Sequence, residues 1–343
     1  MKKRGFLQFG IAVFILFLCI GLWFPTWTPG IKKDGSVSEL KEVEINGTKL
    51  TVMIRGEDKS NPVIVFVHGG PGCSEIPYVR KYQDILEKDF TIVHYDQRGS
   101  GKSYHFFEDY STVNTDVHVE DLLVLTEYIT EKFNQEKVIL AGHSFGTYIG
   151  IQAVAKAPEN FTAYIGIGQV ADPVQSEIDS LDYTLAQAKI HKENKDVRKL
   201  ENLRAEIENG DELTPRSLVR KYGGAARLIH DNRDYYLGFL LNPEYNLLDV
   251  VRFQAGVYKT QDALLEEERE HPITENVRNL DIPVYFVMGK YDYMTSIKAA
   301  KRYFETLHAP YKEFVQFDES AHYPQFEEEE KFAKWIRGLE IGY

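Results

Sequence analysis

The residues with the clearest chemical potential in this 343-residue chain are a serine, an aspartate and a histidine that lie far apart in the sequence. Ser144 lies in Gly-His-Ser-Phe-Gly, residues 142–146, between the apolar run 138–141 and a helical pattern. In that setting Gly-x-Ser-x-Gly is typical of a nucleophile elbow, a turn so sharp that glycine is needed at both ends. The serine then points outward at a helix N-terminus. The pattern therefore predicts that Ser144 is a nucleophile.

A serine hydroxyl needs a base that takes its proton and a carboxylate that orients this base. In this arrangement the acid follows the serine in the chain and the histidine comes last. Among the histidines after Ser144, only His322 follows an apolar run, 314–317, on a loop at a strand end. Asp292 is the only carboxylate on the loop after the run 283–288. We predict His322 as the base and Asp292 as the acid, although Asp292 could instead be a turn or helix-capping residue.

Two backbone amides are candidates for binding the oxyanion that forms on the attacked carbonyl. His-Gly-Gly-Pro-Gly, residues 68–72, follows a further apolar run, and consecutive glycines let the backbone approach a substrate closely. We predict that the amide of Gly70 is one donor, with Gly69 as the alternative. The amide of Phe145, directly after the nucleophile, is the second predicted donor.

These residues need a scaffold that brings several strand ends to one edge. Continuous apolar runs, typical of strands covered on both faces, alternate with helical patterns; the runs are 63–67, 91–95, 138–141, 164–167, 284–288 and 314–317. A hairpin turning at Asn46-Gly47 precedes them. The series predicts an α/β fold with a doubly wound, mostly parallel sheet.

The alternation stops in the middle of the chain. Residues 171–277 are rich in charged side chains and tyrosine, have helical patterns, and are too long for one loop. We predict a helical cap there, inserted between two strands and roofing the strand ends where ligands bind. The predicted organisation is an anchor with the start of a linker at 1–30, the first part of the core at 31–170, the cap, and the second part of the core at 278–343.

The N-terminus has the pattern of a membrane anchor. Basic residues 2–4 precede the run 6–24, which has no charge and only Gln8 as a polar side chain. At about 1.5 Å per residue this run spans a hydrocarbon layer of roughly 30 Å. Trp23 and Trp27 occupy interfacial positions. We expect a single transmembrane helix with the remaining chain on the extracytoplasmic side; a cleaved signal peptide is the alternative, but no small-residue cleavage site follows.

Composition excludes several classes of protein. The net charge of −12, without a basic stripe, argues against a nucleic-acid partner. Cys19 and Cys73 are too differently placed to predict a disulfide, and no metal-ligand spacing indicates a metal. Residues 166–171 fit a loose dinucleotide fingerprint but lack the helix and the acid that should follow. We therefore expect no cofactor. The four glutamates at 327–330 are interpreted as the acidic first turn of the last helix, where they complement the helix dipole.

Taken together, these segments are similar to the proline iminopeptidase branch of the α/β hydrolases. The similarity lies in His-Gly-Gly-Pro-Gly at 68–72, Asp-Gln-Arg-Gly-Ser-Gly at 96–101, Gly-x-Ser-x-Gly at 142–146, Gly-x-x-Asp at 289–292 and Ser-Ala-His at 320–322. It covers most of the chain from about residue 40 and is weak through the cap. The resemblance implies an α/β-hydrolase fold, a Ser-His-Asp triad with an acyl-enzyme, and release of an N-terminal residue, typically proline, from small peptides.

The resemblance also implies that acids of the cap receive the substrate's free amino group, and Glu177 and Glu244 are our candidates. The family usually has glycine before the nucleophile and tryptophan after it, whereas this chain has His143 and Phe145. These two positions bear on the preference for proline more than on the chemistry. A carboxylesterase or lipase with the same triad, acting on esters, stays open, as does a non-catalytic binding module on this scaffold. The oligomeric state stays open too.

Overall fold

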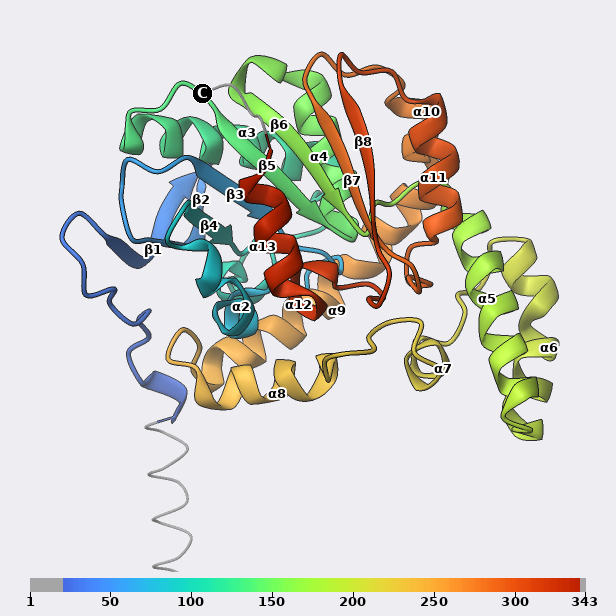
Figure 1. Ribbon diagram of the computed structural model, residues 1–343. Coiled ribbons are helices and arrows are strands. Elements are labelled where there is room, and N and C mark those ends of the chain that lie inside the picture. Colours follow the sequence, from blue (N-terminus) through green and yellow to red (C-terminus); the bar gives the residue numbers. More distant parts are fainter. Residues whose placement is uncertain (1–20, 340–343) are drawn as a thin grey trace, which may run out of the picture.

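A single eight-stranded sheet forms the centre of the computed structural model, which describes residues 21–339 (Figure 1). The strand order is β1-β2-β4-β3-β5-β6-β7-β8. The strands are β1 (Val37–Ile45), β2 (Thr48–Gly56), β3 (Val63–Val67), β4 (Thr91–Tyr95), β5 (Val138–His143), β6 (Phe161–Ile167), β7 (Val284–Gly289) and β8 (Lys312–Phe317). β2 pairs antiparallel with β1 and β4, and all other neighbours are parallel. The predicted mostly parallel sheet is confirmed.

The continuous apolar runs become strands because both faces of the sheet are covered. Along β3, Val63, Val65 and Val67 pack into one apolar cluster, while Ile64 and Phe66 pack into another on the opposite face. Each such buried side chain contributes about 1.5–3 kcal/mol by leaving water. Burial on both faces thus explains the absence of polar alternation along the strand.

Helices of the core cover the two faces separately. The first cluster takes side chains from α3 (Thr115–Phe133), α4 (Phe145–Lys156) and α11 (Ile297–Thr306). The second takes them from α13 (Glu329–Arg337) and the short helix η1 (Asp84–Leu86). The remaining core helices are α2 (Ile76–Gln83), α12 (Pro324–Glu327), η2 (Gly101–Ser103) and η3 (Pro158–Asn160). This two-sided covering makes the sheet doubly wound.

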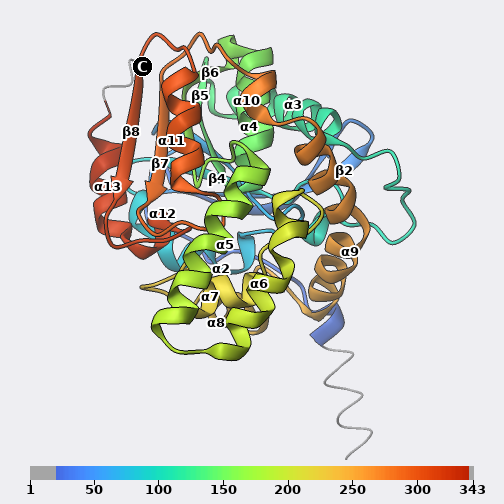
Figure 2. The ribbon, with the colours of Figure 1, turned by 90° about the vertical axis from the view of Figure 1, so that its right-hand side faces the viewer.

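A group of helices between β6 and β7 forms a cap. They are α5 (Pro173–Ile190), α6 (Asn194–Glu208), α7 (Arg216–Lys221), α8 (Asp231–Leu241) and α9 (Leu247–Glu270), all within the range predicted for the cap. The short α10 (Ile273–Asn276) lies in the same range but packs on the core through Ile273. Figures 1 and 2 show α5–α8 on the side to which the parallel strands point. α5, α6 and α7 share an apolar cluster, which includes Leu181, Leu200 and Leu218. The cap therefore covers the carboxyl edge of the sheet.

The chain before β1 is bound to the cap. Trp27 donates its backbone N–H to the carbonyl of Pro243 at 3.0 Å. The Thr28 hydroxyl donates to Glu244 Oε1 at 3.1 Å and accepts from Arg55 Nη1 at 2.7 Å. The composition of residues 28–38 indicates a linker. The bonds of Trp27 and Thr28 fix the N-terminal end of this linker to the cap and to β2.

The N-terminal transmembrane helix predicted at residues 6–24 is corrected by the structure. Within residues 21–339, no helix has the length and apolarity needed to cross a membrane. Of the predicted span, the structure describes residues 21–24, and helix is assigned there only to 21–23, whereas a helical span takes about 20 apolar residues. Residues 6–20 of the predicted span lie outside the described residues. The predicted transmembrane helix, and the membrane-anchored extracytoplasmic location that followed from it, are therefore wrong for the part of the chain that the structure describes.

Candidate active site

Ser144 occupies a strained turn between β5 and α4. Its φ of 55° and ψ of −127° lie in a region that residues other than glycine rarely adopt. A Cβ at Gly146 would overlap the carbonyl oxygen of Val67, and a Cβ at Gly142 would lie 2.7 Å from the carbonyl oxygen of Gly146. Glycine is therefore needed at both ends of the turn, and the turn directs the Ser144 side chain into a cavity.

His322 and Asp292, predicted from chain order, lie together. His322 Nδ1 is 2.9 Å from Asp292 Oδ2, and both side chains are buried. Asp292 Oδ1 also accepts the N–H groups of Met294 and Thr295, each at 3.0 Å, and Oδ2 accepts the Thr295 hydroxyl at 3.0 Å. A carboxylate oxygen accepts hydrogen bonds, so the bond between His322 and Asp292 is donated by the Nδ1–H of His322. In a neutral ring that donates through Nδ1, Nε2 is the acceptor nitrogen.

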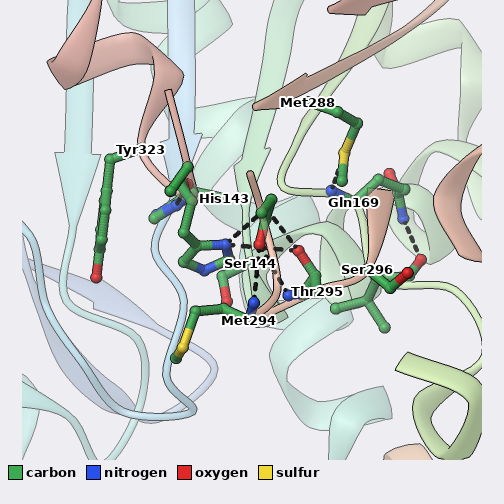
Figure 3. Close-up of polar contacts among 12 residues, drawn as sticks. His143, Ser144, Gln169, Met288, Met294, Thr295, Ser296 and Tyr323 are labelled. Atoms are coloured by element: carbon green, nitrogen blue, oxygen red, sulfur yellow. Dashed lines mark hydrogen bonds and ion pairs between the residues drawn. The ribbon is translucent and has the colours of Figure 1, made fainter. Parts of the chain in front are cut away.

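Ser144 and His322 line the same cavity. Figure 3 shows polar contacts around Ser144, Met294 and Thr295. The alternative role of Asp292 as a helix cap is filled by another residue, because Ser296 Oγ accepts the N–H groups of Lys298 and Ala299 at the start of α11. Asp292 still shapes its turn through Met294 and Thr295. It can therefore be both a turn residue and the partner of the base.

Gly168 is a residue of this site that the sequence analysis missed. It lies after β6, with φ of 56°, and a Cβ there would lie 3.0 Å from His322 Nδ1 and 3.3 Å from Asp292 Oδ2. Any side chain would press on the His322–Asp292 pair. Residues 166–171 fit a loose dinucleotide fingerprint, but at Gly168 the glycine leaves room for the side chains of His322 and Asp292.

The glycine-rich loop after β3 passes beside the nucleophile. A Cβ at Gly69 would lie 2.6 Å from Ser144 Cβ and 3.2 Å from Ser144 Oγ. Gly70 has φ of 121°, which favours glycine, and it lines the cavity together with Phe145. Phe145 is the first residue of α4, so helix geometry gives its N–H no internal partner. Both predicted oxyanion donors thus lie at the cavity that Ser144 lines.

A buried ion pair in the wall of the cavity, next to Ser144, was also missed. His143 Nδ1 lies 2.5 Å from Glu75 Oε1, and His143 Nε2 lies 3.0 Å from the carbonyl oxygen of His322. Both partners are acceptors, so the ring of His143 carries both protons and is an imidazolium. Burial acts to lower the pKa of His143, but the Glu75 carboxylate outweighs it and the pKa is raised; the pKa of Glu75 is lowered, as His143 overcomes the opposing effect of its burial.

The cavity has a volume of about 740 Å³ and extends from Ser144 to the cap. Carboxylates outnumber cationic side chains in its lining: the acids are Glu75, Glu177, Asp211, Glu212, Asp231, Asp234, Asp262, Glu266 and Glu268, and the cations are Arg216, Arg220, Arg269 and the imidazolium of His143. Arg216 and Arg220 are already paired, with Glu177 and Asp231 respectively. The cavity is therefore suited to a cationic group at its cap end.

The structure separates the two acids predicted to bind an amine. Glu177 lines the cavity, where its carboxylate accepts Arg216 Nη2 at 2.5 Å and the N–H of Thr214 at 2.8 Å. Glu244 is buried outside the lining and binds Arg80 Nε at 2.8 Å as well as Thr28. Glu244 thus joins the cap to α2 and to the N-terminal segment.

Glu268, on α9, is the acid of the lining whose electrostatics stand out. Burial, and then the neighbouring charge of Glu177, raise the pKa of its carboxyl to about 7, while Arg216 and Arg269 act in the opposite direction. A cation bound beside it would favour the charged form. Nothing in the local sequence distinguishes Glu268 from its glutamate neighbours, because two of the charges that act on it, Glu177 and Arg216, come from α5 and α7.

A serine at the β5–α4 turn, an acid after β7 and a histidine after β8, under a cap inserted after β6, define the class of α/β hydrolases. A family model described as "alpha/beta hydrolase fold" matches residues 62–329. The chain belongs to this family and is a hydrolase.

Individual relatives make the resemblance narrower. The chain is 31% identical over 313 residues to a probable aminopeptidase, YbaC, of Bacillus subtilis, with 89% of this chain and 97% of that protein covered. It is 24% identical over 309 residues to a proline iminopeptidase of Saccharolobus solfataricus, covering 81% and 84%. The crystal structure of a proline iminopeptidase of Mycobacterium smegmatis shares the fold, with a TM-score of 0.63 at 14% identity over 87% and 96% of the chains. The predicted resemblance to the proline iminopeptidase group is confirmed.

Proposed function

We propose that this hydrolase is a serine aminopeptidase that releases N-terminal residues from small peptides through Ser144, His322 and Asp292. The observation that carries the proposal is the cavity, which joins Ser144 and His322 to a cap lining with an excess of carboxylates. A substrate's scissile carbonyl at Ser144 would have its α-ammonium group nearby, and a negative lining favours that charge. The aminopeptidase names of the relatives support the same substrate class.

In the proposed reaction, Ser144 Oγ attacks the carbonyl carbon while His322 Nε2 takes the hydroxyl proton. The resulting oxyanion accepts N–H groups of Gly70 and Phe145. Collapse of the tetrahedral intermediate breaks the C–N bond, and His322 gives its proton to the leaving amine. Asp292 keeps Nδ1 protonated and stabilises the imidazolium. Water then attacks the acyl-enzyme by the same route and frees the amino acid and Ser144.

Within the cap, Glu268 and Glu177 are the carboxylates we assign to the substrate's ammonium group. Glu177 already shares its charge with Arg216, whereas no ion pair of Glu268 occurs among the described residues. An incoming ammonium would give Glu268 the cation that favours its ionised form. Glu244, outside the cavity lining, has no part in this assignment.

A substrate panel tests the proposal. The wild type and Ser144→Ala are compared on aminoacyl-β-naphthylamides, on the same amides with an acetylated amino group, and on p-nitrophenyl esters. We expect hydrolysis of the free-amine amides, little hydrolysis of the acetylated ones, and none by the variant. Hydrolysis of esters alone would instead indicate a carboxylesterase. Failure of a fluorophosphonate to label Ser144 would indicate a binding module.

A further inference from the structure

Glu327, at the end of α12, uses both oxygens of its carboxylate to accept backbone N–H groups from two distant parts of the chain. Oε1 accepts from Ala321 at 3.0 Å and Tyr323 at 3.4 Å, and Oε2 accepts from Arg227 at 2.7 Å and Leu228 at 2.9 Å. Its side chain is buried, with 8% exposure. The expected role in the first turn of the last helix does not apply, because α13 begins at Glu329.

The Oε1 side of this carboxylate holds the loop of the base. Ala321 and Tyr323 are the two neighbours of His322 in the chain. The backbone of His322 is fixed as well, since its N–H donates to the carbonyl of Ala225 at 3.0 Å and its carbonyl accepts from His143 Nε2 at 3.0 Å. The base therefore lies on a loop in which three successive residues are hydrogen-bonded through the backbone.

The Oε2 side holds the cap. Arg227 and Leu228 belong to the irregular segment 224–228 between α7 and α8. The same segment reaches the loop of the acid, because the carbonyl of Gly224 accepts the N–H of Tyr293 at 2.9 Å, one residue after Asp292. Segment 224–228 thus contacts the acid loop, the base loop and Glu327 at once.

We propose that Glu327 is a positioning residue that fixes the loop of His322 to segment 224–228, so that the base is in place only when this part of the cap is seated. The inference rests on the proposed function, which makes His322 the base. Only a carboxylate satisfies both pairs of donors. An amide of the same size has one acceptor oxygen, and its NH2 would face two N–H groups on the other side.

The first experiment compares Glu327→Gln with Glu330→Gln, which removes the same charge from an exposed position on α13. Reactive sites are counted by labelling Ser144 to saturation with a fluorophosphonate, and kcat is expressed per labelled site. A displaced base should lower kcat of Glu327→Gln by about 10- to 100-fold with KM unchanged. Glu330→Gln should match the wild type.

We expect kcat for p-nitrophenyl acetate to fall by the same factor. This ester is too small to reach the cap acids, so an equal decrease indicates that Glu327 positions the base and does not act by recognising the amine. A role in folding alone would lower the labelled fraction or the melting temperature and leave kcat per labelled site unchanged. That result would overturn the proposal.

Glu327→Asp is the second variant and decides the matter if Glu327→Gln does not fold. It keeps the charge but is one methylene shorter, so it reaches only one of the two donor pairs, and kcat should fall similarly. Wild-type kcat in this variant would overturn the bridging role. If the wild type is active and both variants resemble Glu330→Gln, only the role of Glu327 fails; if Ser144 of the wild type neither labels nor turns over substrate, the proposed function fails.

Discussion

The two sides of the cavity are organised in different ways. The floor consists of the loops at the sheet edge that carry Ser144, Asp292 and His322, and the roof consists of the cap segments that carry the lining carboxylates. On the floor, the carboxylate of Asp292 is saturated with donors and the backbone of His322 is bound on both sides. On the roof, charged side chains project from helices, and Glu268 has a pKa raised to about 7 mainly by burial. The fixed floor suits catalysis, because the catalytic groups must be held in accurate positions. The roof, with carboxylates that are still free to pair with a cation, suits recognition of the substrate.

The strongest way to sharpen this contrast is to remove the nucleophile. Ser144→Ala should lower kcat by about six orders of magnitude, because the acyl-enzyme forms on this hydroxyl. The melting temperature should stay close to that of the wild type or rise. The substitution removes only a hydroxyl, and the backbone strain of the turn, with φ of 55° at this residue, is present in both proteins. Initial rates on an aminoacyl-β-naphthylamide measure the loss of activity.

Ser111→Ala, at an exposed loop position, is the control and should be unchanged. Residual activity of Ser144→Ala within tenfold of the wild type would show that Ser144 is not the nucleophile.

A smaller loss is expected when the acid is replaced by its amide. In Asp292→Asn the Oδ1 side can keep the N–H groups of Met294 and Thr295, and the NH2 then faces His322 Nδ1. The ring would have to accept there and carry its proton on Nε2, the wrong tautomer for a base. We expect kcat to fall by about 10⁴-fold. Steady-state kinetics measure this, and a variant with wild-type kcat would contradict the assigned pairing.

Glu75→Gln tests whether the rigidity of the floor depends on a buried charge. Removing one partner of a buried ion pair costs about 3–5 kcal/mol, so the free energy of unfolding should fall by this order near pH 6. The pKa of Glu75 is lowered from 4.5 and that of His143 raised from 6.5 on folding. The contribution of the pair is therefore complete between about pH 4.5 and pH 6.5. It is lost as pH falls through the lowered pKa of Glu75 or rises through the raised pKa of His143.

Urea unfolding across this pH range measures the effect, with Glu131→Gln, an exposed change on α3, as control. The wild type should lose up to about 1.4 kcal/mol per pH unit from His143 above pH 6.5, and Glu75→Gln should lack this slope. Equal unfolding curves for the wild type and Glu75→Gln at every pH would refute a charged pair.

The smallest expected effect lies on the roof. Glu268→Gln should raise KM for free-amine substrates about tenfold, because a charge-assisted hydrogen bond contributes about 1.5–3 kcal/mol, while kcat and the hydrolysis of small esters stay unchanged. Glu270→Gln, at an exposed position near the end of the same helix, is the matched control. If Glu268→Gln lowers kcat instead of raising KM, the division between floor and roof is wrong.

The sequence was sufficient for the parts of the site that depend on local pattern and chain order. Continuous apolar runs predicted the strands, and the strand ends led to Ser144, Asp292 and His322. Contacts between distant segments could not be predicted from the sequence. Glu75 binds His143, and Glu327 binds the backbone of Arg227, because the loops after β3 and β8 and the cap converge at the carboxyl edge of the sheet. Glu244 looked like any acid of the cap, and only its burial beside Arg80 and Thr28 shows its structural use.

The attachment of the N-terminal segment has a practical consequence for protein engineering. Glu244 receives a hydrogen bond from Thr28, and Pro243 receives one from Trp27. A recombinant version shortened to start at β1 would leave the Glu244 carboxylate with Arg80 and would free the α8–α9 connection of the cap. A shortened protein meant for crystallisation or assay should therefore retain the sequence from Phe24 onward, whose carbonyl accepts Asn246 Nδ2 at 2.9 Å.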